Sequence, residues 1–266
     1  ERSRYDNQLA YALRDLPKEQ LQPSLMFEPD LVGNLVVYGA SGSGKSTLLR
    51  SIAVAAAFAR PETPVHVYGL DFGSKSLAML EPLPNVGSIV SASDHDRVTR
   101  LLAHLDATIE ERRERYGQEV DTLTAYRRSP GATPDPRVLL LVDGVLGFQQ
   151  AYESTDRMRW FDLFTSIAAR GRSVGVHVVM SAEQRGGLPS GLMSSFPQRV
   201  VLRMATADDY WPLGVPDDVL SIASPPGRGL IGSTTIQVAT PGGSALPARQ
   251  AEHIVEIAAV LTELGH

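Results

Sequence analysis

A glycine-rich segment, residues 39–47, is the part of the sequence best suited to binding phosphate. It consists of Gly39, Ala40, Ser41, Gly42, Ser43, Gly44, Lys45, Ser46 and Thr47. Residues 39–46 match the pattern G-x-x-x-x-G-K-[ST], whose glycines let successive backbone N–H groups point inward and form an anion-binding nest. The lysine of this pattern reaches the β- and γ-phosphates, and the hydroxyl that follows it binds Mg²⁺. We therefore predict that residues 39–47 bind ATP, with Lys45 on the phosphates and Ser46 on the metal.

Such a loop must be held between a buried strand and a helix. The apolar run at residues 35–38 predicts the strand, and the pattern Lys45–Arg60 predicts the helix. The positive N-terminal end of that helix would add to the attraction for phosphate.

A second acidic group is expected at the end of a neighbouring strand, where it would hold the water shell of the magnesium ion. Asp143 follows the apolar run Val138–Val142 and fits that role. The alternative is that Asp143 only caps the turn after a buried strand.

The residue after Asp143 bears on turnover. In many P-loop ATPases a glutamate at this place acts as general base toward the attacking water. Here the place is taken by Gly144, and the next acidic residue is Glu153. We predict that nucleotide binding is intact and that hydrolysis is slow, unless a base comes from elsewhere.

The elements around these residues predict an α/β fold with a mostly parallel sheet and helices on both faces, because apolar β-branched runs alternate with helical patterns. Buried strands are expected at Leu35–Tyr38, Val65–Leu70, Ser88–Val90, Val138–Val142, Val176–Met180 and Val200–Met204, and edge strands at Ser24–Phe27 and Gly229–Val238. Further helices are expected at Asp94–Tyr116, at Arg157–Arg170 and from Pro247 onward. We expect residues 1–30 to form an N-terminal edge or linker segment and residues 31–266 to form the ATPase domain.

Composition narrows the possible functions. The chain has 266 residues, a net charge of −5 and no cysteine, which excludes disulfides and thiolate chemistry. Its acidic balance disfavours nucleic acid as a partner. Only three of its 25 basic residues are lysines, and Lys45 is one of them. Because the apolar runs are short and residue 1 is Glu, we expect a piece cut from a longer chain whose membrane segments lie elsewhere.

Several segments together resemble the FtsK/SpoIIIE superfamily of RecA-like motor ATPases. Residues 169–185, which read A-R-G-R-S-V-G-V-H-V-V-M-S-A-E-Q-R, are similar to a characteristic segment of that superfamily, and so is F-P-Q-R-V at residues 196–200. The likeness is greatest to the second ATPase domain of the EccC/EssC motors of type VII secretion. It rests on L-D-F-G at residues 70–73, L-V-D-G at residues 141–144 and P-P-G-R-G-L at residues 225–230.

This resemblance implies a RecA-like P-loop NTPase that uses ATP and Mg²⁺ and works at the cytoplasmic face of the bacterial membrane. It implies neighbouring ATPase domains in the same polypeptide, a possible hexamer, and small helical secreted proteins or a linker peptide as partners. Second domains of this kind often lack the general base, in agreement with Gly144.

The same comparison suggests further site residues. Gln184 would sense the γ-phosphate or orient the water, unless it is a solvated loop residue. Arg170 and Arg172 would act on a neighbouring subunit's nucleotide, or else only complement a helix C-terminus. Glu183 departs from the superfamily, which often has threonine there.

Two other groups of residues have both a functional and a structural interpretation. Tyr210 and Trp211, near Leu213 and Val215, would line a groove for a partner peptide or else belong to the core. His177 lies within an apolar run and is expected to be buried and hydrogen-bonded.

The leading hypothesis is an ATP-binding motor module of a type VII-like secretion ATPase. The alternatives are an FtsK-type DNA translocase domain and a structural module that keeps its nucleotide without turnover.

Overall fold

The computed structural model describes residues 6–117, 120–153, 156–216 and 218–264. Within these residues one sheet runs through the molecule, with strands in the order β2-β1-β10-β9-β8-β3-β7-β6-β4-β5. The strands are β1 (Leu9–Arg14), β2 (Ser24–Phe27), β3 (Leu35–Tyr38), β4 (Val65–Asp71), β5 (Val86–Ser91), β6 (Arg137–Asp143), β7 (Val176–Ala182), β8 (Gln198–Leu202), β9 (Arg228–Ile231) and β10 (Thr234–Val238).

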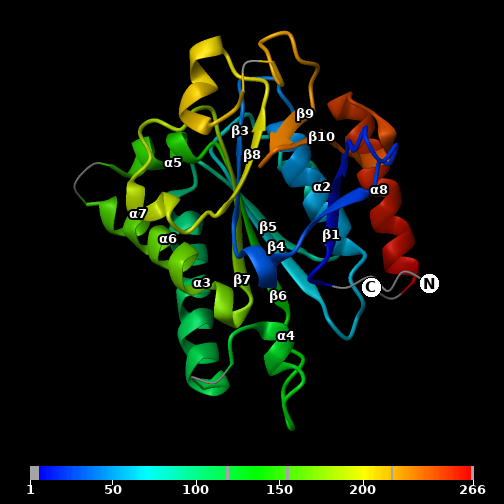
Figure 1. Cartoon of the computed structure of the whole chain (residues 1–266). Coiled ribbons are helices and arrows are strands. Elements are labelled where there is room, and N and C mark those ends of the chain that lie inside the picture. Colours follow the sequence, from blue (N-terminus) through cyan, green and yellow to red (C-terminus); the bar gives the residue numbers. More distant parts are fainter. Residues whose placement is uncertain (1–5, 118–119, 154–155, 217, 265–266) are drawn as a thin grey trace.

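The six strands from β8 to β5 are parallel, so their carboxyl ends meet at one edge. Side chains alternate between the two faces: Val36 packs with one apolar cluster, and Leu35 and Val37 pack with the other. Figure 1 shows the sheet between two helical layers. One layer holds α2 (Lys45–Ala57) and α8 (Pro247–Glu263), and the other holds α3 (His95–Tyr116), α5 (Val145–Tyr152) and α6 (Met158–Arg170). The α/β fold with a mostly parallel sheet is thus confirmed.

Three short helices complete the set of α-helices in the described residues. They are α1 (Pro29–Val32), α4 (Leu123–Tyr126) and α7 (Ser190–Met193). No helix in the described residues has the length and apolar character needed to cross a bilayer.

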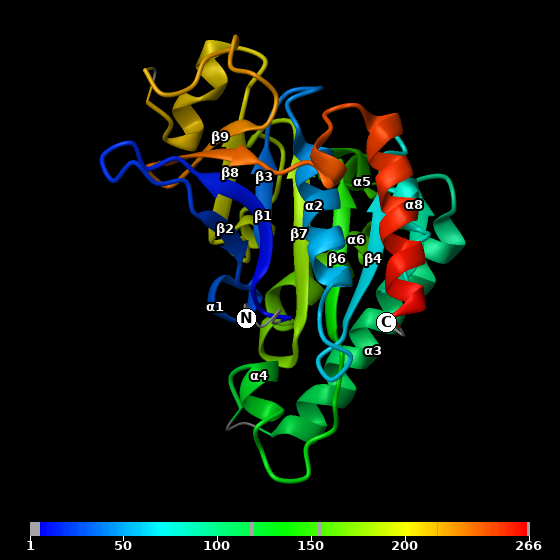
Figure 2. The same ribbon diagram turned by 90° about the vertical axis from the view of Figure 1, so that its right-hand side faces the viewer.

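An antiparallel extension continues the sheet beyond β8, and Figure 2 shows β1, β2, β8 and β9 on the same side of the molecule. The prediction of a single edge strand at Gly229–Val238 is wrong. The segment forms the hairpin β9–β10, because Gly232, with a φ of +57°, turns the chain between the two strands. Strand β1 was not predicted, and it lies with β2 inside the N-terminal segment 1–30.

The remaining predicted elements lie close to the observed ones. The expected strand Val200–Met204 is β8, which begins and ends two residues earlier. Helix α2 ends at Ala57 rather than at Arg60, and Asp94 caps the N-terminus of α3 by accepting from the Arg97 backbone N–H.

A buried polar network ties the N-terminal segment to the parallel strands at their amino ends. The Arg137 guanidinium is fully buried and bonds to the carboxylates of Asp6 and Asp30, with N–O distances of 2.8 and 2.7 Å. His177 is buried as expected, within 2.8 Å of the same guanidinium and 2.9 Å of the Gly33 carbonyl oxygen. Burial and, to a lesser extent, the charge of Arg137 together lower the pKa of His177 to about 3.

Candidate nucleotide site at the carboxyl edge of the sheet

The phosphate-loop segment joins β3 to α2 at the carboxyl edge of the sheet. Gly42 and Gly44 have φ angles of +69° and +109°, a region that side-chain-bearing residues rarely adopt. A Cβ on Gly44 would lie 3.0 Å from the backbone nitrogen of Gly227, which itself donates to the Ser43 carbonyl oxygen at 2.8 Å. The loop therefore requires glycine at residue 44 and is braced by the segment that leads into β9.

Lys45 lies at the first turn of α2 and points back across the loop. Its Nζ donates to the carbonyl oxygens of Gly39 and Ala40, at 2.7 and 2.9 Å. Burial lowers the pKa of Lys45, while the negative charges of Glu183 and Asp143 act in the opposite direction. The ammonium is thus held inside the loop, where the phosphates of a nucleotide would meet it.

Asp143, at the end of β6, accepts hydrogen bonds from three hydroxyl groups. Its Oδ2 accepts from Ser46 and from Ser76, both at 2.7 Å, and its Oδ1 accepts from Ser181 at 2.5 Å. The structure thus brings together the two predicted magnesium residues, Ser46 and Asp143. Ser76 and Ser181 were missed by sequence reasoning, although Ser181 lies within the segment that resembles the superfamily.

These oxygens fit a magnesium site that a nucleotide would complete. The described residues contain no cluster of three or more His, Cys, Asp or Glu side chains that could hold a metal by itself. Magnesium in phosphate-transfer sites typically uses one or two carboxylates together with substrate oxygens and water. One hydroxyl and one carboxylate at hydrogen-bond distance are therefore a suitable pair of groups.

Asp71, at the end of β4, is a second carboxylate at this edge that sequence reasoning did not assign to the site. It lies beside Asp143 in the sheet register and accepts from the backbone N–H groups of Gly73, Lys75 and Leu77 at 2.9–3.1 Å. Burial raises the pKa of Asp71, and the nearby charge of Asp143 adds to the rise. Asp71 thereby shapes the turn that carries Ser76 to Asp143.

A cavity of about 330 Å³ extends from the phosphate loop toward the C-terminal helix. Its wall joins the start of α2 with β10 and the start of α8, including Thr47, Gln237, Val238 and Pro247. Arg50 also lines it and is buried, with its guanidinium hydrogen-bonded to the Gln250 amide oxygen. The volume lies within the range of small-molecule sites, so the cavity has room for the nucleoside of a bound nucleotide.

The other predicted site residues lie outside this cluster. Gln184 is exposed in the loop after β7. Arg170 and Arg172 precede β7 and so lie toward the opposite, amino edge of the parallel strands. Arg170 bonds to Asp106 and Glu110, and Arg172 donates to the Asp30 and Leu31 carbonyl oxygens. Neither arginine reaches the phosphate loop of its own chain.

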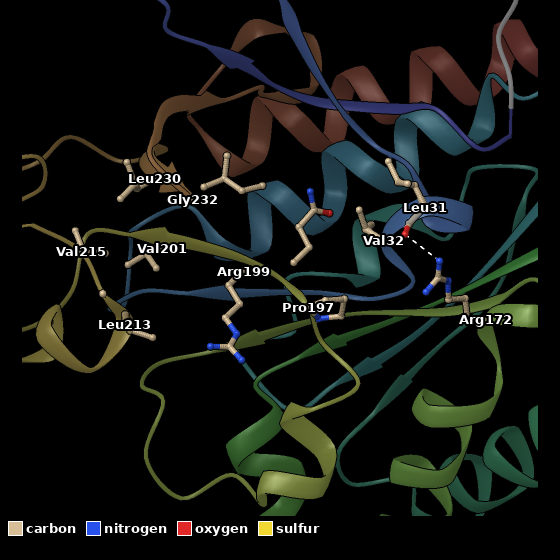
Figure 3. Close-up of a pocket in the computed structure, with 13 residues that line it drawn as sticks. Leu31, Val32, Arg172, Pro197, Arg199, Val201, Leu213, Val215, Leu230 and Gly232 are labelled. Atoms are coloured by element: carbon tan, nitrogen blue, oxygen red, sulfur yellow. Dashed lines mark hydrogen bonds between the residues drawn. The ribbon is translucent and has the colours of Figure 1, made fainter.

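A second cavity, of about 650 Å³, lies between α1, β8 and β9 (Figure 3). Eight of its thirteen lining residues are apolar, among them Val32, Val201, Leu213, Val215 and Leu230, and we refer to it as the apolar cavity. Two guanidinium groups, of Arg172 and Arg199, stand at the same cavity.

The structure corrects the expected aromatic groove in part. Tyr210 is buried in the core, and its hydroxyl accepts from the Met204 backbone N–H at 3.0 Å, so of its two interpretations the structural one holds. Trp211 is 85% exposed, but the cavity wall includes Leu213 and Val215 rather than Trp211.

Comparison with known proteins gives the family. The family model described as "FtsK/SpoIIIE family" matches residues 2–211, most of the chain. The chain belongs to the FtsK/SpoIIIE family. Its fold, with the phosphate loop on the strand beside β7 and β8, is accordingly that of P-loop ATPases of this type.

The similar curated proteins are secretion ATPases. The chain is 33% identical over 179 residues to the ESX secretion system protein EccC of Thermomonospora curvata, covering 65% of this chain and 13% of that protein. It is 30% identical over 200 residues to the ESX-4 secretion system protein EccC4 of Mycobacterium tuberculosis, covering 73% of this chain and 16% of the relative. This FtsK/SpoIIIE chain therefore spans only a small part of the length of these relatives.

Solved structures of EccC and EssC resemble nearly the whole chain. A structure with ATPases 2 and 3 of Geobacillus thermodenitrificans EssC superposes with a TM-score of 0.83 at 22% identity, over 97% of this chain and 49% of that one. A structure of Thermomonospora curvata EccC (ATPases 2 and 3), in complex with a signal sequence peptide, gives a TM-score of 0.80 at 27% identity, over 97% and 48%. The resemblance to EccC/EssC motors suggested by the sequence motifs is confirmed.

Proposed function

We propose that this chain is an ATP-binding module of a type VII-like protein secretion motor, with slow hydrolysis. The observation that carries the proposal is the meeting of Lys45, Ser46 and Asp143 at the carboxyl edge of the sheet. These residues supply an ammonium for the β- and γ-phosphates and two oxygen ligands for Mg²⁺. Its similarity to proteins of ESX and type VII secretion systems supports this class of motor.

The bound nucleotide would lie with its phosphates on residues 39–47 and its base in the cavity toward β10 and α8. When bound, Mg²⁺ would neutralise charge on the β- and γ-phosphates. Ser46 and Asp143 would orient that ion, and Ser76 and Ser181 would hold the Asp143 carboxylate in place. Gly144 leaves the usual general-base position without a side chain, which supports slow turnover.

The test is a calorimetric titration with Mg²⁺–ATP, using Lys45→Ala as the variant and Lys18→Ala as the matched control. We expect micromolar or tighter binding to the wild type and to Lys18→Ala, and a loss of at least about tenfold for Lys45→Ala, which is about 1.4 kcal/mol of binding free energy. A wild-type chain that binds no nucleotide would refute the proposal.

The apolar cavity beside β8 and β9 supports a partner site. One relative was solved with a signal sequence peptide, and we propose that a segment of a secreted protein or a linker from a neighbouring ATPase domain occupies this cavity. The apolar residues of the wall would bury its apolar side chains, and Arg199 would pair with an acidic one. Fluorescence anisotropy with labelled peptides from secreted proteins that are encoded in the same genome tests the site. Val215→Asp is expected to abolish the binding.

The wider setting is proposed from the same relatives. The module would be one of several ATPase domains in a polypeptide at the cytoplasmic face of the bacterial membrane, and it would act within an oligomer such as a hexamer. Arg170 and Arg172 would serve a neighbouring subunit in that oligomer, and Gln184 would act at the γ-phosphate. All three assignments stay predictions.

A further inference from the structure

The strand ends around the phosphate loop offer three carboxylates, and two of them are already engaged. Asp143 accepts from three hydroxyl groups, and Asp71 accepts from three backbone N–H groups. Neither carboxylate is placed to accept a proton from water without giving up these bonds. The third carboxylate is Glu183, the residue that directly follows β7.

Glu183 is brought to the loop by the pairing of β7 with β3. Tyr38 lies opposite Ala182 in the parallel register, and the Gly39 N–H donates to the Ala182 carbonyl oxygen at 3.1 Å. The carbonyl oxygen of Gly39, in turn, accepts from Lys45 Nζ. Glu183 therefore leaves the sheet beside the first residue of the phosphate loop, one residue beyond the contact that fixes the loop.

The ends of β6 and β7 are also bonded to each other. The Ser181 hydroxyl donates to Asp143 and accepts from the Gly144 N–H at 2.9 Å. Gly144 and Glu183 thus follow two adjacent parallel strands whose ends are held together. Because no carboxylate directly follows β6, the nearest position that could supply one is the residue that directly follows β7.

The Glu183 side chain is available for such a role. It is exposed and makes no hydrogen bond or ion pair with the residues that the structure describes. Its charge acts on Lys45, and this electrostatic interaction raises the Lys45 pKa against the effect of burial. The position of the carboxylate follows from the backbone, because Glu183 comes directly after the residue whose carbonyl oxygen bonds to the Gly39 N–H at the start of the phosphate loop.

We infer that Glu183 is the general base of this ATPase in place of the residue missing at position 144. The inference rests on the proposed function. In the step, the Glu183 carboxylate takes a proton from water as the water oxygen bonds to the γ-phosphorus. The bond from that phosphorus to the β–γ bridging oxygen breaks, its electron pair stays on ADP, and inorganic phosphate is released.

The test compares Glu183→Gln with Glu114→Gln, an exposed glutamate on α3 far along the chain from the loop. We measure Mg²⁺–ATP turnover at saturating nucleotide, and separately the Kd values for ATP and ADP in Mg²⁺ buffer. Glu183→Gln is expected to lower the already slow wild-type turnover about 100-fold further, the usual contribution of a general base. Because a negative charge near the γ-phosphate is removed, ATP should bind several-fold more tightly relative to ADP. Glu114→Gln should leave both quantities unchanged.

Two results would overturn the inference while leaving the proposed function intact. The first is tight, Lys45-dependent ATP binding with a turnover that Glu183→Gln does not change. The second is tight binding with no measurable turnover by the wild-type chain. An absence of ATP binding would instead remove the proposed function itself. A shift in the ratio of ATP to ADP affinity without a change in turnover would place Glu183 near the γ-phosphate but would reject its role as base.

Discussion

At the scale of single residues, Gly144 is fixed by conformation as well as by the absence of a side chain. Its φ is +81°, and an added Cβ would lie 3.1 Å from the backbone of both Phe72 and Gly73. A side chain at this place would therefore be strained and would press on the turn that follows β4. The general base cannot be restored here by a simple substitution.

We accordingly expect Gly144→Glu to lower stability without raising turnover. Gly214→Ala is a suitable control, because Gly214 has the same left-handed conformation, with a φ of +71°, and nothing lies within 4 Å of an added Cβ. Gly214→Ala should cost about 1 kcal/mol, the conformational penalty alone. Gly144→Ala should cost more, about 2–3 kcal/mol, because of the added backbone contacts. Urea unfolding measures both, and equal costs would contradict the expectation.

At the scale of elements, α8 is joined to α2 by a polar contact inside the molecule. The buried Arg50 guanidinium of α2 donates to the Gln250 amide oxygen of α8, and the Gln250 amide group donates to the Ser244 carbonyl oxygen at 2.8 Å. These partners are 200 positions apart in the sequence. Gln250 lies one turn before Ile254 on the buried face of α8, but a glutamine at that place does not by itself predict burial.

Gln250→Leu should leave the Arg50 charge buried without this acceptor. We expect a loss of about 2–3 kcal/mol in the free energy of unfolding, the usual cost of an unsatisfied buried charged donor. Gln250→Glu retains an oxygen acceptor and should be less destabilising. Chemical denaturation with both variants provides the measurement, and a fully stable Gln250→Leu protein would refute the assigned role.

The polar network below β6 and β7 predicts a dependence of stability on pH. The pKa of His177 is about 3 in the folded chain and near 6.5 when unfolded, so the unfolded chain binds this proton first as pH falls. Stability should therefore fall between pH 6.5 and pH 4, by on the order of 3 kcal/mol.

Other groups must be separated from this effect. Burial also lowers the pKa of His66, which gives a smaller change of the same sign. Burial alone would raise the pKa of Asp30, but its hydrogen bond with Arg137 brings the pKa below the usual value, so its effect begins below pH 4. When the midpoint of thermal unfolding is measured from pH 7 to pH 4, it should fall less in His177→Gln than in His66→Gln. An equal pH dependence of the midpoint in the two variants would show that groups other than His177 cause the loss of stability.

The elements that the sequence predicts well are those with a local signal. Apolar runs predict β3, β4, β6 and β7, because strands buried on both faces have few polar residues. Strand β1 escapes prediction although residues 9–13 are apolar, because its two alanines favour a helix and its place depends on pairing with β10, more than 220 residues away. The site divides in the same way. The phosphate loop and Asp143 follow from motifs, whereas Asp71, Ser76 and Gly227 join the site only through folding.

At the scale of the whole molecule, the two cavities share one hairpin. Leu230, Ile231 and Gly232 line the apolar cavity, whereas Gly227, Gln237 and Val238 line the one at the phosphate loop. Shortening a hairpin side chain in the apolar cavity should therefore change the affinity for the nucleotide. We expect Leu230→Ala to weaken ATP binding several-fold, and Leu213→Ala, which lines the same cavity from outside the hairpin, to change it little. Isothermal titration of ATP into both variants is the measurement, and equal affinities would show that the hairpin transmits nothing.

The backbone hydrogen bond from Gly227 to Ser43 connects this shared hairpin to the phosphate loop, so binding at the two cavities can be coupled. A partner that shifts β9 would shift the brace of the phosphate loop, so the free energies of the two binding events would not be independent. Linkage is reciprocal: a nucleotide that tightens the loop would favour or oppose the partner by the same factor by which the partner alters nucleotide affinity. In a module of this kind the bound partner would change the residence time of the nucleotide, even if hydrolysis of that nucleotide is rare.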